Sequence, residues 1–391
     1  MNIPFSDRVN GLKPSAIREI FKYSADPNYI PLSAGNPAPE AFPVKEIAEI
    51  SEKILREAPV AALQYGSTEG YPALRQALSD YMRETHQTGT QEDLLLVTSG
   101  AQQVMDLFTK AMVNPGDVVI CEDPSFIGSL NTFRSYQAKL AGIPMASDGM
   151  DLAALEQACQ LENVKFLYTI PNYQNPSGIT MSAQKRQEVY RLCKKYQVMI
   201  LEDNPYGDIR FRGAPVPAIK SLDTDGFVMY AGTFSKVISP GMRVGYAIGP
   251  AAMIQKMVVC KQGEDVHTNM WGQLVCHRFL TDYDYEGHLA GLRDLYRKKA
   301  ALTQELLQQY LAPKGITWNA FDGGLFTWCR LPEGTDMPAF CQRALKQQVC
   351  VVPGTAFLCD TEASSDAFRI NFSTPTEEQL TTGIQRLGTL L

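Results

Sequence analysis

Histidine is scarce in this chain of 391 residues, which contains only His86, His267, His277 and His288. Serine and cysteine hydrolases need a positioned imidazole base, and zinc enzymes usually need two or three imidazole ligands near a pattern such as H-E-x-x-H. The sequence contains no such pattern. We therefore expect no metal site, and any catalysis must rest on lysine, aspartate, tyrosine or a bound cofactor.

Cysteine spacing excludes two further classes of site. The nine cysteines are an odd number, and none of them forms a C-x-x-C pair. Most lie in apolar stretches, such as the one that ends at Cys121, where a free thiol behaves as a small hydrophobic side chain. The pattern favours neither a metal cluster nor a disulfide framework.

Positive charge is also in short supply, because 36 Lys and Arg face 42 Asp and Glu and give a formal net charge of −6. This balance lacks the basic surface of a nucleic-acid-binding protein. No apolar run approaches the roughly 20 residues of a membrane-spanning helix, and residues 1–15 resemble neither a signal peptide nor a transit peptide. We expect a cytoplasmic protein without nucleic-acid or membrane partners.

Short β-branched runs alternate with segments of helical periodicity, which is the pattern of crossover units around a mainly parallel sheet. The predicted strands cover residues 94–98, 118–121, 139–143, 164–170, 198–201, 227–231 and 244–248. The predicted helices between them cover residues 102–112, 126–135, 152–159, 183–196 and 251–262. The fold class is therefore α/β, with a seven-stranded mainly parallel sheet between helices.

The pattern changes after Tyr285, where a long helical stretch precedes short strands near 316–318 and 325–329 and a helix from Thr376. This change predicts a second, smaller α+β domain at the C-terminus. The expected parts are an N-terminal arm that belongs with the small domain (1–40), a large ligand-binding domain (41–285) and the small C-terminal domain (286–391).

Two predicted strand ends offer sites for an anion. Residues 98–102 end one strand and open a helix, whose first backbone N–H groups are free to bind an anion. Thr233, Ser235 and Lys236 follow another strand, with Arg243 a few residues later. A lysine confined near other cations has a lowered pKa and can attack a carbonyl, although an isolated lysine is usually a solvated surface residue.

Two more strand ends carry polar residues. Asp203 and Tyr206 follow the run 198–201, and a carboxylate there could hold a heteroaromatic N–H group. The segment 171–178 forms a Pro- and Asn-rich turn that would fix the Asn175 amide over a pocket, although such turns are also common as plain loops. Together the four segments suit a ligand with a phosphate, a ring nitrogen, a ring hydroxyl and a carbonyl, which is pyridoxal 5′-phosphate (PLP).

An ordered series of motifs carries a resemblance to a known family. The motifs are Y-G-S-T-E-G-Y-P-A-L-R (65–75), T-S-G-A-Q-Q (98–103), E-D-P-S-F (122–126), P-N-Y-Q-N-P-S-G (171–178), E-D-N-P-Y (202–206), G-T-F-S-K (232–236) and R-V-G-Y (243–246). The chain resembles class I/II aminotransferases of PLP fold type I from about Lys13 to its C-terminus. Within that class it is most similar to the subgroup of 2-aminoadipate, kynurenine and aromatic aminotransferases.

The resemblance implies a role for each matching residue. Lys236 would bind the cofactor covalently and move the proton of the substrate Cα, and Asp203 would contact the pyridine nitrogen. Asn175 and Tyr206 would contact the ring oxygen, and Phe126 would stack on the ring where the family commonly has tyrosine. The other implied cofactor contacts are Ser99, Gly100, Ala101, Gln102, Thr233, Ser235 and Arg243, with Tyr65 reaching in from the second subunit of a homodimer.

Arg369 in F-R-I-N-F matches the family's arginine that binds the substrate α-carboxylate, with Asn175 and Gly35 assisting. Arg18 could read an acidic side chain or be an ordinary surface charge. These residues predict amino transfer between an L-amino acid (aromatic, aliphatic or 2-aminoadipate-like) and a 2-oxo acid such as 2-oxoglutarate, within amino acid metabolism and biosynthesis.

Two alternatives stay open at this point. A PLP-dependent β-lyase or decarboxylase would share the cofactor site, because fold type determines the cofactor better than the bond that breaks. A non-catalytic PLP sensor domain, of the kind fused to a helix-turn-helix in transcription regulators, would also share it. The start of the pattern near Lys13 and the acidic net charge argue against the sensor.

Overall fold

Eight strands form the central sheet of the computed structural model, which describes residues 3–10, 23 and 26–391. The strand order is β1-β8-β7-β6-β5-β2-β3-β4, parallel from β7 to β3 and antiparallel at β8 and β4. Its strands are β1 (Asp93–Thr98), β2 (Val118–Asp123), β3 (Lys139–Ala146), β4 (Gly149–Met150), β5 (Val164–Thr169), β6 (Met199–Asp203), β7 (Val228–Thr233) and β8 (Gly245–Pro250). All seven predicted strands are present, and the two residues of β4 add an eighth at the edge.

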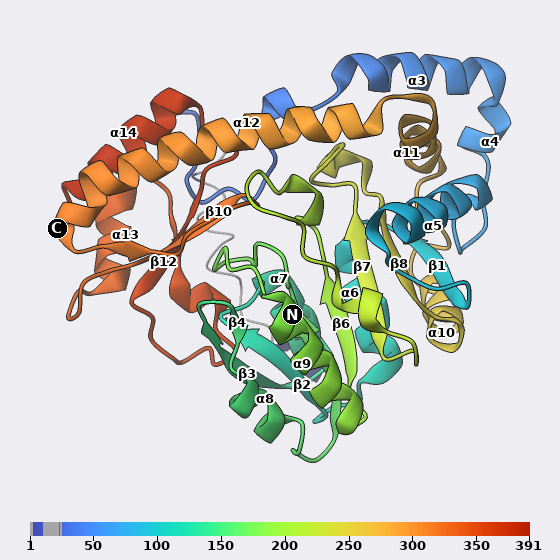
Figure 1. Ribbon diagram of the computed structural model, residues 1–391, viewed down its shortest axis with the longest axis horizontal. Coiled ribbons are helices and arrows are strands. Elements are labelled where there is room, and N and C mark those ends of the chain that lie inside the picture. The colour runs from blue at the N-terminus through green and yellow to red at the C-terminus, as the bar shows by residue number, and fades with distance from the viewer. Residues whose placement is uncertain (1–2, 11–22, 24–25) are drawn as a thin grey trace.

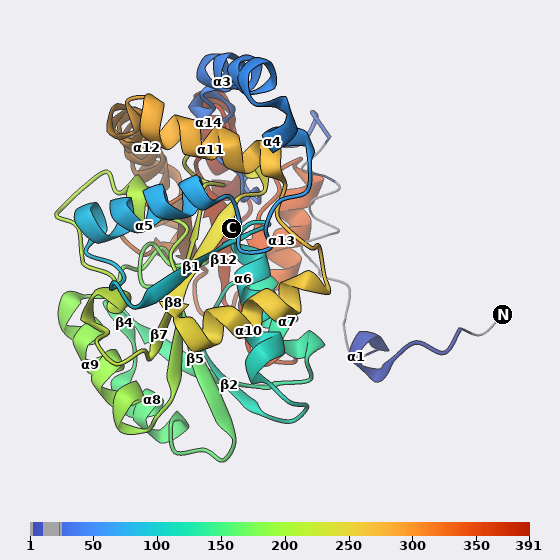
Figure 2. The same ribbon diagram turned by 90° about the vertical axis from the view of Figure 1, so that its right-hand side faces the viewer.

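Helices cover both faces of this sheet, as Figure 2 shows. One face packs against α6 (Ala101–Met112), α7 (Ile127–Ser135) and α10 (Ala251–Gln262), and the other against α8 (Leu152–Ala158) and α9 (Ala183–Lys195). Each face has its own cluster of buried apolar side chains. All five predicted helices are confirmed with ends within one residue of those expected, because their apolar stripes match the sheet they cover.

Among the described residues, six α-helices lie where the sequence analysis predicts none. They are α1 (Asp7–Asn10), α3 (Val44–Glu57), α4 (Pro59–Leu63), α5 (Pro72–His86), α11 (Met270–Asp282) and α13 (Met337–Lys346). Helix α5 begins with Pro72, whose fixed φ suits a first helical position, and buries Leu74, Leu78 and Met82 at helical spacing. In the described part of the chain no helix is long and apolar enough to cross a membrane.

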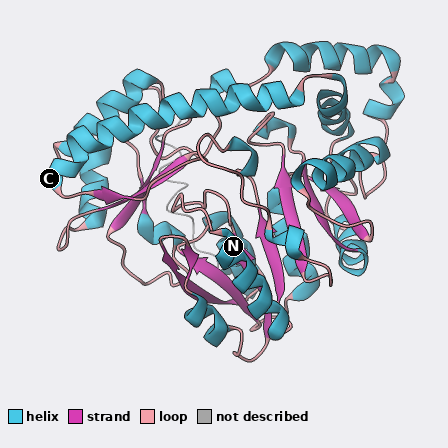
Figure 3. Cartoon of the chain, viewed as in Figure 1, coloured by secondary structure: helices cyan, strands magenta, loops and turns pink. Residues whose placement is uncertain are grey.

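The C-terminal region forms the smaller α+β unit that the sequence predicts. Helix α12 (Tyr285–Leu306) runs along one edge of the molecule from the small sheet to the region of α11 (Figures 1 and 3). The small sheet is antiparallel, in the order β11-β12-β10-β9. Its elements are β9 (Thr317–Trp318), β10 (Phe326–Arg330), β11 (Val352–Pro353) and β12 (Ala367–Asn371), followed by α14 (Glu377–Gly388).

The end of the N-terminal region pairs with this small sheet. Ile30 forms a parallel bridge with Val349, and the backbone N–H of Asn371 donates a 2.7 Å hydrogen bond to the carbonyl of Leu32. These contacts bring Gly35 close to the junction of the two sheets. The domain boundaries at 40/41 and 285/286 stay a prediction.

Candidate active site

A cavity of about 500 Å³ lies between the carboxyl ends of the large-sheet strands and the small sheet. Most of the predicted site residues line it, although they come from segments far apart in the sequence. They are Gly35, Ala101, Gln102, Phe126, Asn175, Asp203, Tyr206, Thr233, Ser235, Lys236, Arg243 and Arg369.

Lys236 follows β7 and extends its amine into this cavity. Its Nζ donates a 2.8 Å hydrogen bond to the backbone carbonyl of Gly35. Burial and, to a smaller extent, the positive charges of the nearby Arg369 and Arg243 guanidinium groups together lower the pKa of Lys236 to about 8. A substantial fraction of the amine is therefore neutral near physiological pH, which is the form that attacks a carbonyl or accepts a proton.

Asp203 ends β6 with one carboxylate oxygen held and the other unpaired. Tyr168 donates a 2.8 Å hydrogen bond to Oδ2, and Ser129 donates one of 2.9 Å to the Tyr168 hydroxyl. Oδ1 is buried without a hydrogen-bond partner among the described residues. Burial raises the pKa of Asp203 to about 7, while the Tyr168 hydrogen bond opposes this rise. The free oxygen suits the N–H of a pyridinium ring, because that donor would supply the missing bond.

Arg369 projects from β12 on the opposite side of the cavity. Nη1 donates to Oδ1 of Asn175 at 2.8 Å, and Nη2 donates to the carbonyl of Ser33 at 2.8 Å. Its guanidinium carbon lies 4.1 Å from the ring centroid of Phe326. Burial lowers the pKa of Arg369 to about 10, so the group stays charged at neutral pH. Nε has no hydrogen-bond partner within the described chain, which leaves a donor for a bound anion.

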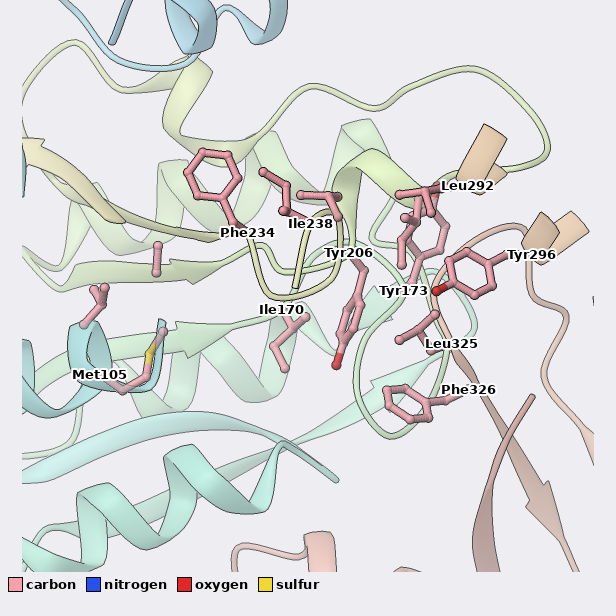
Figure 4. Packing of buried hydrophobic residues seen from close by; sticks show 14 of the residues in the cluster. Met105, Ile170, Tyr173, Tyr206, Phe234, Ile238, Leu292, Tyr296, Leu325 and Phe326 are labelled. Atoms are coloured by element: carbon pink, nitrogen blue, oxygen red, sulfur yellow. The ribbon is translucent and has the colours of Figure 1, made fainter. Parts of the chain in front are cut away.

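Tyr206 lies between these groups, with its ring meeting Phe326 edge-on at a centroid distance of 5.8 Å (Figure 4). Burial raises the pKa of Tyr206 well above its usual value, although Arg369 nearby opposes this rise. The phenol is therefore a hydrogen-bond donor at neutral pH.

The start of α6 and the loops after β7 form an anion-binding corner. Gly100 has a φ of 83°, and a Cβ on it would collide with the Arg243 guanidinium. Arg243 Nη2 donates to the carbonyl of Ser99 at 2.9 Å, and Thr233 donates to the Ser235 hydroxyl at 2.9 Å. The unpaired N–H groups of the helix start, two hydroxyls and a guanidinium match the acceptors of a phosphate. The anion-binding corner therefore fits the phosphate of PLP, and the free Asp203 oxygen fits its pyridine nitrogen.

Phe126 precedes α7 and lines the cavity with its ring over Gly128. A Cβ at Gly128 would lie 2.6 Å from that ring, so the absence of a side chain there allows the ring to take this place. The sequence analysis does not single out Gly128.

Three of the predicted residues that the structure describes, Ser99, Gly100 and Tyr65, do not line the cavity. The Ser99 hydroxyl donates to Asp265 at 2.7 Å, so only its backbone faces Arg243, and Gly100 forms the turn. Tyr65 is 81% exposed, and Arg18 lies outside the described residues. The Ser99 hydroxyl is thus already bonded to Asp265, and the cofactor contacts predicted for Ser99 and Gly100 stay a prediction.

Several lining residues are absent from the sequence-based predictions. They are Met105, Ile127, Gly128, Asn131, Ile170, Pro205, Pro240 and Phe326. Behind the cavity, Tyr168 and Ser129 form the hydrogen-bond chain to Asp203. The only sequence signal for Tyr168 is that it is a polar residue one position before the end of the buried strand β5. Its contact with Asp203 depends on how β5 pairs with β6, which the sequence does not show.

Comparisons with known proteins agree with this geometry. The family described as aminotransferase class I and II matches residues 27–387. The chain is 37% identical to aromatic-amino-acid aminotransferase 1 of Thermococcus litoralis, over 98% of this chain and 93% of the relative. It is 34% identical to 2-aminoadipate transaminase of Thermus thermophilus, over 99% and 96% of the two chains.

A solved structure shows the same fold. Kynurenine aminotransferase of Pyrococcus horikoshii, in a complex with PMP, superposes with a TM-score of 0.95 at 35% identity, over 99% of this chain and 96% of that one. The predicted fold type, cofactor and class of reaction are thereby confirmed. The chain belongs to the class I and II aminotransferases and is a PLP-dependent transaminase.

Proposed function

We propose that this transaminase transfers the amino group of an aromatic, aliphatic or 2-aminoadipate-like L-amino acid to a 2-oxo acid such as 2-oxoglutarate. The observation that carries the proposal is that the buried Arg369 fork and the Lys236 amine line one cavity. Around them the cavity wall is largely apolar, with Ile127, Ile170 and Phe326 among its residues. The names of the similar aromatic-amino-acid and 2-aminoadipate enzymes support the same range of donors.

Arg369 binds the α-carboxylate of the donor in this proposal. Its planar fork offers two parallel hydrogen bonds, and its contact with Asn175 keeps the fork in place. Gly35, whose carbonyl accepts from Lys236, lines the same cavity. Holding the carboxylate on one side presents the Cα–H bond to the lysine on the other.

Lys236 moves the proton in this proposal. PLP, when bound, supplies an electron-withdrawing ring that stabilises negative charge at the substrate Cα. Lys236 would bind the cofactor covalently, and its amine, freed when the substrate amine takes its place, would carry the proton from Cα to the cofactor carbon and the reverse in the second half of the cycle. A pKa near 8 suits an amine that both accepts and donates a proton, because both protonation states are present around neutral pH.

Asp203 and Tyr206 orient the ring and tune its charge. Asp203 accepts the pyridinium N–H and keeps that nitrogen protonated, and Tyr206 and Asn175 donate to the ring oxygen. Ala101, Gln102, Thr233, Ser235 and Arg243 hold the phosphate, and Phe126 stacks on the ring.

We propose further that the enzyme is a cytoplasmic homodimer of amino acid biosynthesis in which Tyr65 completes the site of the other subunit. Tyr65 is exposed at 81% and leans edge-on against His267, away from the groups that line its own cavity. Val60 and Leu63 nearby are also more than 70% exposed, which is typical of a surface that a second subunit covers.

The absorption spectrum of the purified enzyme tests the transfer. The visible band of the lysine-bound cofactor should convert to the amine form of the cofactor with a good donor and return when 2-oxoglutarate is added. Lys236→Ala should bind PLP without this cycle. Release of pyruvate and ammonia, or of carbon dioxide, in place of reversible conversion would instead identify a β-lyase or a decarboxylase.

A further inference from the structure

A second cavity, of about 600 Å³, lies behind the wall that carries the catalytic groups. The segment 203–208 is common to both cavities. Asp203 and Tyr206 line the catalytic cavity, whereas Asn204 and Asp208 line the second one. A ligand in the second cavity would therefore contact the backbone segment that positions two catalytic side chains.

The residues that line this second cavity carry more positive than negative charge, although the whole chain carries −6. Two of its arginines are paired with aspartates outside the lining, Arg212 with Asp322 at 3.9 Å and Arg297 with Asp294 at 2.8 Å. Four arginines line it against two carboxylates, so its formal charge is 4 − 2 = +2 with histidine neutral. The arginines are Arg210, Arg212, Arg293 and Arg297, and the carboxylates are Asp208 and Glu286. A concave site of this sign attracts small anions.

Arg293 and Arg297 are held in place with part of each guanidinium still available. Their Nε atoms donate to the carbonyls of Asp208 at 2.8 Å and Phe211 at 3.1 Å. Nη1 of Arg297 is paired with Asp294 at 2.8 Å and Nη1 of Arg293 lies 4.0 Å from Glu286, but the Nη2 atoms of both arginines have no hydrogen bond to any described residue. The two side chains are 32% and 49% exposed, so a ligand can reach them.

The spacing of these two groups is set by α12. Four residues along a helix correspond to a rise of about 6 Å on one face. Two carboxylates joined by a short carbon chain span a similar distance. Guanidinium forks bind carboxylates with two parallel hydrogen bonds, so each arginine can take one end of such a ligand.

The facing wall offers a further unsatisfied group. Nε2 of His86 is buried without a hydrogen-bond partner among the described residues and lies 3.5 Å from Oδ1 of Asp208. Next to it, Thr85 of α5 is exposed at the cavity, and its hydroxyl forms no hydrogen bond within the described chain. The site therefore has two fixed cations on α12 and an unpaired ring nitrogen at the end of α5.

We propose that this second cavity is a binding site for a short dicarboxylate, with one carboxylate at Arg293 and the other at Arg297. The site is separate from the catalytic Arg369 and does not depend on which amino acid the enzyme uses. Glutarate is a suitable probe because it has neither an amino nor an oxo group and cannot be turned over.

Calorimetric titration of the holoenzyme with glutarate tests the proposal. Arg297→Gln should weaken binding by about tenfold or more, which corresponds to about 1.4 kcal/mol. The matched control is Arg191→Gln on α9, where Arg191 pairs at 2.9 Å with Glu188 three residues earlier, as Arg297 does with Asp294. This control should bind glutarate like the wild type.

Thr85→Glu provides a second variant in case Arg297→Gln does not fold. It places a negative charge at the cavity without removing a hydrogen bond, and it should weaken glutarate binding while leaving the cofactor spectrum unchanged. Glutarate could also bind to Arg369 in the catalytic cavity. The variants in the second cavity therefore decide where the measured binding occurs. If the folded variants bind glutarate like the wild type, or if the wild type does not bind it, the proposal is wrong.

Discussion

At the scale of single residues, the Tyr168 hydroxyl determines how Asp203 can serve a cofactor. It donates to the ionised carboxylate, which lowers the pKa of Asp203 against the effect of burial. Tyr168→Phe removes this donor, so the pKa of Asp203 should rise above about 7. At pH 7 the carboxyl would then be mostly protonated, and the Kd of PLP should increase by about tenfold, since one hydrogen bond to a charged group is lost. Titrating the cofactor-free protein with PLP measures this change.

Tyr173→Phe is the matched control for this prediction. Tyr173 is equally buried, but its hydroxyl has no hydrogen-bond partner in the part of the chain that the structure describes. Its removal should leave the Kd of PLP unchanged. The affinity difference between the two variants should shrink as the pH rises and Asp203 ionises in both. A difference that stays constant from pH 6 to 9 would show that Tyr168 acts by packing alone.

Lys236 should make the stability of the cofactor-free protein depend on pH. The folded-state pKa is about 8, below the ordinary 10.5, so the unfolded chain binds more protons between these values and stability rises with pH there. Lys236→Met removes the buried ammonium and should raise the free energy of unfolding by about 3 kcal/mol at pH 7. The advantage should fade as the pH approaches 10.5. Denaturant unfolding at several pH values measures it, with Lys256→Met at an exposed position of α10 as the control.

At the scale of elements, the junction between β1 and α6 should tolerate no side chain at Gly100. Gly100 and Gly116 have similar φ values of 83° and 89°, so alanine at either position costs a similar backbone strain of about 1 kcal/mol. Only at Gly100 does the new Cβ collide with Arg243, because no atom lies within 4 Å of a Cβ at Gly116. Gly100→Ala should therefore weaken PLP binding by more than about tenfold, and Gly116→Ala should not. Equal affinities in the two variants would contradict a role for Arg243 in the phosphate corner.

The sequence predicts an element well when the burial of its side chains produces a simple pattern of apolar and polar residues. The central strands β5, β6 and β7 are almost entirely buried and appear as short apolar runs, which the sequence pattern reveals. The sequence pattern does not reveal helix α11, because seven of its thirteen residues are buried and no wide polar face marks its period. Strand β12 was missed although its Arg369 was predicted, because an arginine and an asparagine in a five-residue strand interrupt the apolar run.

At the scale of the whole molecule, the site depends on pairings that a single sequence does not reveal. Lys236, Asp203 and Asn175 were predictable because each follows a recognisable strand and matches a family motif. Tyr168 and Phe326 were not, because their contacts with Asp203 and Arg369 arise only when β5 pairs with β6 and the small sheet packs over the cavity.

Subunit mixing tests whether Tyr65 acts across the proposed dimer. Tyr65→Ala and Lys236→Ala should each be poorly active alone. In a mixed dimer, the subunit that retains Lys236 receives an intact Tyr65 from its partner, whereas the other site carries both defects. Random reassociation should therefore restore about a quarter of the wild-type activity, because half of the dimers are mixed and each has one complete site. If Tyr65 served its own subunit, mixing would restore nothing, because each mixed dimer would contain one site without the lysine and one without the tyrosine.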